Sequence, residues 1–222
     1  MKTIVFAATK GGTGKTSLAF NVAIEASKSH QVLIADLDPQ RSLKGIWQKR
    51  GEMLNPRLVS NVSVLAQSIK LLAEAGYDRE YMVVDTPGSM MAVIRDAIAA
   101  ADLLVLPVQP SPMDWAAQEA LCDLADEMGM RDRTLIVINR AEGRSDLVDR
   151  TREFFQMRTP FAMPVVKDRV EYKRGIEVGK AATEMTTNKD YQKEIRDLWQ
   201  AIKAAIETKA SRKEARDERR VH

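Results

Sequence analysis

The residues with the clearest chemical potential form the heptapeptide KGGTGKT at positions 10–16. Its three glycines would let the backbone wrap closely around phosphate oxygens, because glycine has no side chain in the way. Lys15 and Thr16 then supply an ammonium group for the β- and γ-phosphates of a nucleotide and a hydroxyl group for Mg²⁺. An apolar run precedes the heptapeptide and a helical pattern follows it, so the loop would present its anion to a helix N-terminus. The pattern predicts a phosphate-binding loop with contacts from Gly11, Gly12, Thr13, Gly14, Lys15, Thr16 and Ser17.

The loop departs from the common phosphate-loop pattern, G-x4-G-K-[ST], in one respect. That pattern requires glycine at position 9, where this sequence has Thr9. A second lysine, Lys10, stands instead at the front of the loop. We interpret this arrangement as the deviant form of the motif.

Three aspartates stand where predicted buried strands end. Asp36 and Asp38 lie in the stretch ADLDPQ, and Asp85 ends the apolar run Tyr81–Asp85. The carboxyl ends of parallel strands form the edge at which α/β sheets bind ligands, so these carboxylates should lie near the loop. One of the first two could anchor a Mg²⁺-bound water and the other could orient the attacking water, while Asp85 is placed for the Mg²⁺ shell. A single aspartate at a strand end is usually a turn residue, but three of them beside a phosphate loop favour a metal–phosphate site.

Apolar runs alternate with helical patterns along most of the chain, which predicts an α/β fold of the doubly wound P-loop type. Its sheet should be mainly parallel, with helices on both faces. Strands are expected at residues 4–8, 32–36, 62–65, 81–85, 103–107 and 134–138, the last ending at Asn139. Helices are expected at residues 16–29, 42–50, 68–75, 92–101 and 113–129, with Gly129 as a cap, and in a long final segment. We expect one ATPase domain over residues 1–208 and a basic tail over residues 209–222.

Composition narrows the possible functions. The 222 residues are 45% hydrophobic and 29% charged, and no apolar stretch of about 18 residues suggests a membrane span. Cys122 is the only cysteine, which excludes an internal disulfide and a CxxC metal pair, and two histidines do not favour histidine catalysis. The net charge of +3 comes from residues 209–220, with six basic and three acidic side chains, so the rest of the chain is electrically balanced.

Five stretches together resemble the ParA/MinD family of deviant Walker A ATPases, and within it the short, ParF-like partition ATPases. The resemblance covers nearly the whole chain. The stretches are KGGTGKT at 10–16, DLDPQRS at 36–42, VVDTPGS at 83–89, VLPVQPSPMDWAA at 105–117 and PVVKDRVEYKRGIEVGK at 164–180. The resemblance implies a weak ATPase that a partner protein stimulates.

The resemblance also implies roles for individual residues in catalysis. Lys10 matches the lysine that crosses a dimer interface to the partner's nucleotide, and Lys15 matches the lysine that binds phosphate within its own subunit. Asp38 matches the aspartate that positions the hydrolytic water.

Cofactor contacts follow from the same resemblance. Thr16 matches a Mg²⁺ ligand, and Asp36 and Asp85 match acidic residues near Mg²⁺. Asn139 matches a residue that contacts adenine. The cofactors expected are therefore ATP or ADP and Mg²⁺.

Members of this family differ in the surface that they bind, and the sequence favours DNA. Phosphate contacts by lysine and arginine give salt-sensitive, sequence-independent affinity. A basic cluster provides such side chains at Lys167, Arg169, Lys173 and Arg174, and the tail adds more. A strand is expected from residue 2, so we expect no helix-turn-helix module ahead of the loop. The implied protein is cytoplasmic, forms a homodimer when it binds ATP, and in that state associates with the nucleoid. Its cargo would be a plasmid, a chromosome region or a microcompartment, and its stimulating partner a ParB-type protein or a cargo adaptor.

Three other classes of function could use the same phosphate loop. A MinD-like membrane protein would need an interfacial helix, but the stripe of Ile195, Trp199 and Ile206 in the final helix has a mixed polar face and favours a core contact. An iron–sulfur carrier would need more than the single Cys122. A small-molecule ligase that uses the same loop remains open, although Lys10 favours a nucleotide-sandwich dimer.

Overall fold

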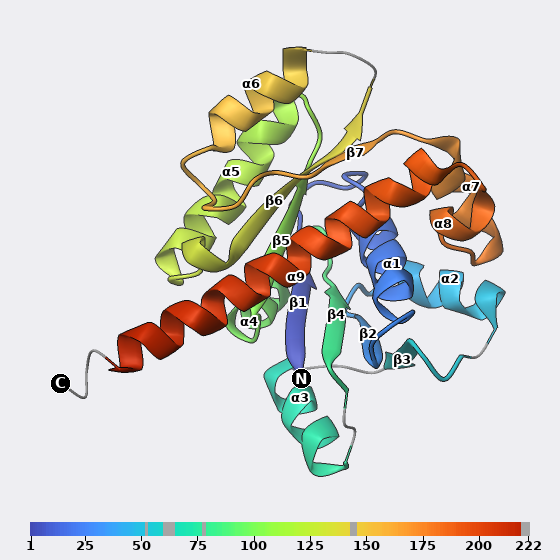
Figure 1. The fold of residues 1–222 in the computed structure, drawn as a ribbon, viewed down its shortest axis with the longest axis horizontal. Coiled ribbons are helices and arrows are strands. Elements are labelled where there is room, and N and C mark those ends of the chain that lie inside the picture. The colour runs from blue at the N-terminus through green and yellow to red at the C-terminus, as the bar shows by residue number, and fades with distance from the viewer. Residues whose placement is uncertain (52, 60–64, 77–78, 143–145, 219–222) are drawn as a thin grey trace.

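The computed structural model describes residues 1–51, 53–59, 65–76, 79–142 and 146–218. A seven-stranded sheet in the order β3-β2-β4-β1-β5-β6-β7 forms its centre, and every pair of neighbouring strands is parallel. The strands are β1 Lys2–Phe6, β2 Val32–Asp36, β3 Arg57–Val59, β4 Tyr81–Asp85, β5 Leu103–Val108, β6 Thr134–Ala141 and β7 Val165–Lys167. The predicted doubly wound P-loop fold is confirmed (Figure 1).

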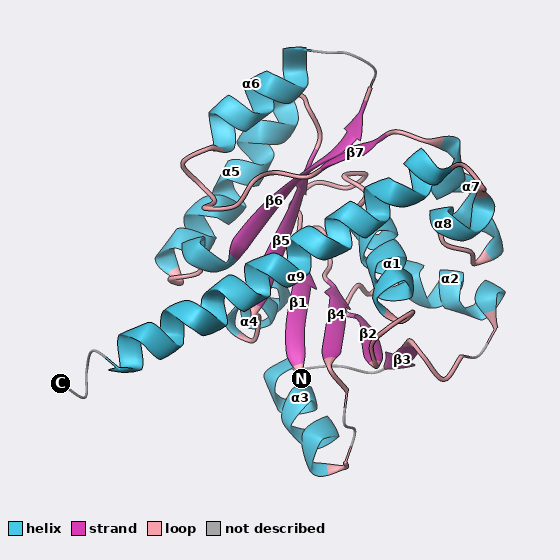
Figure 2. Cartoon of the chain, viewed as in Figure 1, coloured by secondary structure: helices cyan, strands magenta, loops and turns pink. Residues whose placement is uncertain are grey.

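Helices cover both faces of this sheet (Figure 2). Their bounds are α1 Lys15–Ala26, α2 Ser42–Arg50, α3 Leu65–Glu74, α4 Met91–Ala99, α5 Pro112–Glu127, α6 Asp146–Phe155, α7 Val170–Val178, α8 Ala182–Met185 and α9 Lys189–Glu218, with a 3-10 turn at Arg131–Arg133. Successive strand residues point to opposite faces, so Ile4 packs with α1, α2 and α9, and Val5 packs with α4 and α5. Burial on both faces explains why the strands are continuous apolar runs rather than alternating ones.

Two edge strands differ from the sequence-based expectation. The strand expected at residues 62–65 falls mostly outside the described residues, and Leu65 instead begins α3, where its N–H donates to Asp96. The strand beside β2 is Arg57–Val59, and β7 at the other edge was not predicted. Both edge strands have only three residues, too few for a periodic pattern to stand out.

The ends of β6 and α1, which flank the site, differ by one or two residues from the bounds predicted from the sequence. The strand expected to end at Asn139 continues to Ala141, so Asn139 lies within β6. The helix expected to begin at Thr16 begins at Lys15, directly after the loop. Gly129 follows the last helical turn of α5 with a φ of 66°, which confirms its capping role.

The last helix is anchored in the core. Its apolar stripe, Ile195, Leu198, Trp199, Ile202 and Ile206, is at most 5% exposed, which confirms the core-facing interpretation. In Figure 1, α9 crosses one face of the sheet and its C-terminal end projects beyond the body. The helix runs without a break through residue 208, where the sequence had suggested the start of a tail.

The surroundings of Cys122 and the character of the helices bear on two expectations from composition. Cys122 is 1% exposed within α5, and burial raises the pKa of its thiol to about 12, as suits an inert core residue. Within the described ranges, we find no helix with the length and apolar character of a bilayer span.

Candidate functional site

The phosphate loop joins β1 to α1 and takes a shape that requires glycine. Gly12 and Gly14 have φ values of 85° and 87°, in the left-handed region that other residues rarely enter. A Cβ atom at Gly14 would also lie 2.2 Å from Nδ2 of Asn139. The loop borders an open cavity of about 530 Å³, within the range of small-molecule sites. Its lining includes residues 10–17, Asp38 and Gly88, so the predicted phosphate-binding residues do surround one space.

Lys15 and Asp85 form a buried ion pair beneath this cavity. Lys15 Nζ lies 2.5 Å from Asp85 Oδ1, and the two side chains are 8% and 0% exposed. Burial raises the pKa of Asp85, while the charge of Lys15 and its hydrogen bond, together with a hydrogen bond from Thr16, oppose that rise. The pair links the ends of β4 and α1 at the carboxyl edge of the sheet.

A magnesium ion fits the same residues. Asp85 Oδ2 is buried and has no hydrogen-bond partner among the described residues, which is costly for a carboxylate oxygen unless a cation or water reaches it. Thr16, a predicted ligand, lies close enough to Asp85 to lower its pKa through a hydrogen bond. Mg²⁺ beside a nucleotide needs only one or two protein ligands because phosphates and water supply the others. Consistently, the described residues contain no group of three or more acidic, histidine or cysteine side chains suited to an all-protein metal cage.

Asp36 and Asp38 organise the connection from β2 to α2. Asp36 accepts hydrogen bonds from the backbone N–H groups of Asp38 and Lys44, both at 3.0 Å, so each of its oxygens has a donor. Asp38 accepts from the N–H of Gln40 at 2.9 Å and lines the cavity. Asp36 therefore holds Asp38 in place, and its direct role near Mg²⁺ stays a prediction.

Lys10 takes a different position from Lys15. Its Nζ lies 2.9 Å from Oδ1 of Asp114, in the first turn of α5. The Lys10 side chain is 45% exposed, whereas Asp114 is 5% exposed. Lys10 thus stands at the rim of the cavity, held by a neighbouring helix.

Several polar residues secure the loop from outside it, and sequence reasoning missed most of them. Asn139, predicted to contact adenine, donates its Nδ2 to the carbonyl of Thr13 at 2.7 Å. Gln109 donates to the carbonyl of Gly12 at 2.9 Å, and the Thr9 hydroxyl donates to the carbonyl of Ala117 at 2.6 Å. Gln109 lies just after the strand predicted at residues 103–107, within the stretch 105–117 that carries the family resemblance, but neither signal assigned it a role. These hydrogen bonds fix the backbone of the phosphate loop.

A second, smaller cavity of about 60 Å³ adjoins the first on the side of α7. Gly14 and Ser17 line both cavities, and Asn139 and Tyr172 line the smaller one. A triphosphate in the loop would leave its nucleoside on this side, because the γ-phosphate end is marked by Lys15 and Asp38.

The four residues predicted to bind DNA are not equally available. Arg169 pairs with Glu194, and its guanidinium lies 3.5 Å from the ring centroid of Tyr191. The hydrogen bond to Glu194 raises the pKa of Arg169, so the pair is a fixed charge contact between the start of α7 and α9. Lys173 lies 3.1 Å from Asp168.

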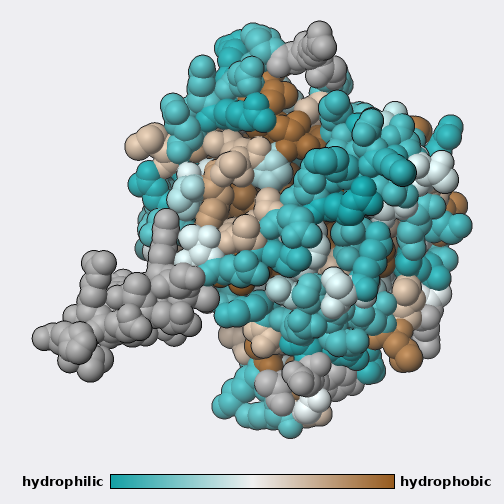
Figure 3. Space-filling model, viewed as in Figure 1, coloured by the Kyte–Doolittle hydropathy of each residue, from teal (hydrophilic) through white to brown (hydrophobic). Residues whose placement is uncertain are grey.

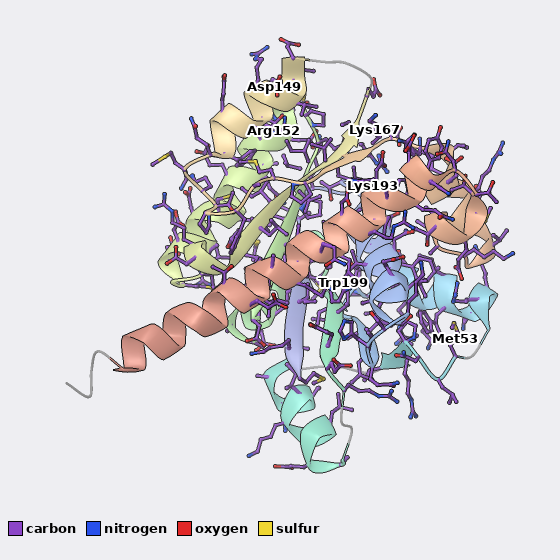
Figure 4. All side chains as sticks on the ribbon, viewed as in Figure 1. Met53, Asp149, Arg152, Lys167, Lys193 and Trp199 are labelled. Atoms are coloured by element: carbon purple, nitrogen blue, oxygen red, sulfur yellow. The ribbon has the colours of Figure 1, made fainter. Side chains whose placement is uncertain are left out.

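The other two predicted DNA contacts are exposed. The side chains of Lys167 and Arg174 form no ion pair with any described residue. Figure 4 shows Lys167 at the end of β7, close in this view to Lys193 on α9.

Comparison with known proteins agrees with this geometry. Residues 4–184 match the family described as CbiA: CobQ/CobB/MinD/ParA nucleotide binding domain. The maintenance of carboxysome distribution protein A of Halothiobacillus neapolitanus is 28% identical over 186 residues, which are 80% of this chain and 84% of that protein. Protein ParA of Rhizobium radiobacter is 32% identical over 61% of each chain. The structure of the cell division ATPase MinD of Pyrococcus furiosus aligns with a TM-score of 0.73 and 18% identity over 91% of this chain and 98% of that one.

The family match spans the phosphate loop, the three aspartates and α7, and the fold similarity extends over most of the chain. The chain therefore belongs to the CobQ/CobB/MinD/ParA family of nucleotide-binding domains.

Proposed function

We propose that this protein hydrolyses ATP, dimerises when ATP is bound, and in that state binds DNA without sequence preference to position a cargo. The cargo would be a plasmid, a chromosome region or a microcompartment. Relatives named for such cargoes are a virulence plasmid ParA family protein of Chlamydia psittaci, the chromosome-partitioning ATPase Soj of Thermus thermophilus and the carboxysome distribution protein described above. A partner protein would stimulate hydrolysis, and the ATP-bound protein would associate with the nucleoid in the cytoplasm.

The observation that carries this proposal is the contrast between the two lysines of the loop. Lys15 is buried against Asp85, in position to hold a phosphate within its own subunit. Lys10 is 45% exposed at the rim of the cavity, where Asp114 is its ion-pair partner. A lysine at the rim is free to reach a nucleotide bound by a second copy of the chain. ATP would then join two subunits, and its hydrolysis would release them.

The residues of the site can carry out slow hydrolysis. Lys15 would stabilise negative charge on the transferred phosphoryl group, and Asp38 would orient the attacking water. Mg²⁺, held by Thr16 and Asp85, would neutralise further charge on the phosphates. Asp36 would fix the position of Asp38, because the Asp36 carboxylate accepts a hydrogen bond from the backbone N–H of Asp38. Among the described residues that line the large cavity, Asp38 is the one acidic side chain, so basal turnover should be low and open to stimulation.

DNA is a better candidate surface than a membrane because of how α9 packs. The apolar stripe of α9 is buried against the sheet, so it is unavailable to insert into lipid without unfolding the core. The face of α9 visible in Figure 3 is mainly hydrophilic. Lys167 and Arg174 provide exposed cations for phosphate contacts, and a dimer would double them.

A DNA-binding titration with two controls tests the proposal. Fluorescence anisotropy of random-sequence duplex DNA should show binding with MgATP and loss of binding with MgADP. The Lys10→Ala protein should lose ATP-dependent binding, while Lys70→Ala, an exposed lysine on α3, should behave as the parent. Absence of DNA binding by the parent at low salt, together with ATP-dependent flotation on anionic liposomes, would instead favour the membrane alternative.

A further inference from the structure

The end of β6 carries a bulge that brings two neighbouring side chains to one place. Ile138 pairs with Val165 of β7 and Ala141 pairs with Lys167, so β6 has one residue more than β7 between these pairs. Arg140, inside the bulge, has a φ of 56°. Side chains of consecutive strand residues normally point to opposite faces of a sheet, yet Asn139 and Arg140 both line the small cavity beside the phosphate loop.

A left-handed backbone at a residue other than glycine is uncommon and strained. Bulges are frequent next to active sites, where they redirect a side chain. Asn139 already has a structural task, since it donates to the carbonyl of Thr13. The Arg140 side chain has no such task, because it forms no hydrogen bond or ion pair with any residue that the structure describes.

The position of Arg140 places a cation between the two cavities. Its Nε would lie 3.9 Å from a Cβ atom at Gly14, the last glycine of the loop. Arg140 is half-buried and lines both the large cavity at the loop and the small cavity beside α7. The two cavities also share Gly14, Ser17 and Ile176, so Arg140 stands where they meet.

Among the described residues, the charged side chains that line the two cavities with Arg140 are mostly cationic. The large cavity is also lined by Lys10, Lys15 and Lys49, with Asp38 as its acidic side chain. In the small cavity, Asp168 lies 3.1 Å from Lys173 and so already has a partner. A half-buried guanidinium among cations is stabilised by an anionic ligand, and phosphate matches its geometry.

We propose that Arg140 is a nucleotide-binding residue whose guanidinium contacts the α-phosphate, at the point where the nucleotide leaves the phosphate loop. The γ-phosphate end of the cavity lies at Lys15 and Asp38, whereas Arg140 borders Ser17 and the nucleoside side. The inference rests on nucleotide binding at the loop. It assigns to Arg140 a contact that ATP and ADP share.

Two substitutions separate this role from a structural one. Arg140→Gly removes the side chain and relieves the left-handed strain, so the ligand-free protein should not unfold at a lower temperature than the parent. Its dissociation constants for MgADP and MgATP, measured by calorimetry, should both rise by roughly tenfold because a charge-assisted contact is lost. Arg152→Met is a control on α6 (Figure 4) and should bind as the parent, because Arg152 is 47% exposed, pairs with Asp149 and lines neither of the two cavities.

Arg140→Lys and Arg140→Met identify the chemistry of the contact. The lysine variant keeps the charge but loses the planar fork of the guanidinium, so its affinity should fall between those of the parent and the methionine variant, while the methionine variant should match the glycine variant. In steady-state kinetics, the methionine variant should change KM for ATP more than kcat.

Several outcomes would overturn the inference. Parent-like affinity of Arg140→Gly for MgADP would show that the side chain does not touch the nucleotide. Loss of MgATP affinity alone would place Arg140 at the γ-phosphate, and equal losses in the lysine and methionine variants would indicate stacking rather than phosphate binding. A parent protein that binds no nucleotide would refute the proposed function itself.

Discussion

Lys10 Nζ lies 2.9 Å from Asp114 Oδ1, so the lysine at the front of the phosphate loop is held by the first turn of α5 in its own chain. Asp114 is nearly buried and Lys10 is half-exposed, which makes the contact a tether at the rim of the site. A lysine that serves a second subunit must leave this tether when the dimer forms. Two predictions about dimerisation follow from that exchange.

The first concerns Lys10 itself. Asp38→Ala should block hydrolysis while the phosphates stay bound, so this variant should accumulate a dimer with MgATP in sedimentation velocity. Adding Lys10→Ala should weaken that dimer about a hundredfold, because one charge-assisted contact to phosphate is lost in each subunit. Lys70→Ala in the same background serves as the control, since Lys70 is 78% exposed on α3. An undiminished dimer in the Lys10→Ala protein would argue against the sandwich arrangement.

The second concerns Asp114. Asp114→Asn should release Lys10 and make the ATP-dependent dimer roughly fivefold tighter, because the tether no longer competes with the partner's phosphate. Glu127→Gln on the same helix is a matched control, since Glu127 is 68% exposed and far along α5 from Lys10. Sedimentation equilibrium with a non-hydrolysable ATP analogue measures both variants. A weaker dimer in Asp114→Asn would mean that Asp114 supports the dimer rather than restraining it.

A third prediction separates the basic residues of the α7 region. Replacing the exposed pair Lys167 and Arg174 with alanine should weaken binding to all DNA sequences alike. The slope of log affinity against log salt concentration should become shallower by about 0.9 for each lost phosphate contact. Arg169→Ala should mainly reduce stability, because it leaves Glu194 without its partner between α7 and α9. Anisotropy titrations at several salt concentrations, alongside urea unfolding, would measure the two effects. Equal loss of DNA affinity with unchanged stability in Arg169→Ala would reverse this assignment.

A fourth prediction concerns the clamp between α2 and α8. Arg50 donates two hydrogen bonds to the carboxylate of Glu184, at 2.7 and 2.8 Å, and a third to the carbonyl of Gly179. Burial alone would raise the pKa of Glu184, but the hydrogen bonds from Arg50 and from the N–H of Ala181 lower it below its usual 4.5. Because the folded-state pKa is lowered, the stabilisation is present above pH 4.5 and is lost as the pH falls through the folded-state pKa.

Glu184→Gln should therefore reduce the free energy of unfolding by about 1 kcal/mol at pH 7, a value that allows for solvent screening of a partly exposed pair. At a pH well below the folded-state pKa of Glu184, the variant and the parent should be equally stable. Urea unfolding at both pH values tests this, with Glu74→Gln on α3 as a control, since Glu74 is exposed and lies 3.8 Å from Lys70. A variant deficit that is the same at both pH values would show that the carboxylate charge is not the stabilising feature.

The central fold was predictable because its signals are local. The five inner strands are continuous apolar runs, and a chain segment buried on both faces must have that composition whatever its neighbours are. The stripe from Ile195 to Ile206 likewise follows from helical period alone. The short edge strands β3 and β7 were missed because three residues carry no periodicity, and their pairing with β2 and β6 depends on where the sheet edge lies.

Within the site, the phosphate loop could be predicted from the sequence alone. The glycines that permit positive φ at positions 12 and 14 belong to one short, continuous motif, so no tertiary contact is needed to recognise it. Tertiary packing, by contrast, sets which basic side chains are held in ion pairs and which are exposed to a ligand. It pairs Lys10 with Asp114 and Arg169 with Glu194, and it leaves the side chain of Lys167 exposed. Those pairings join residues far apart along the chain, and only the packing of α5, α7 and α9 on the sheet brings them within hydrogen-bond distance.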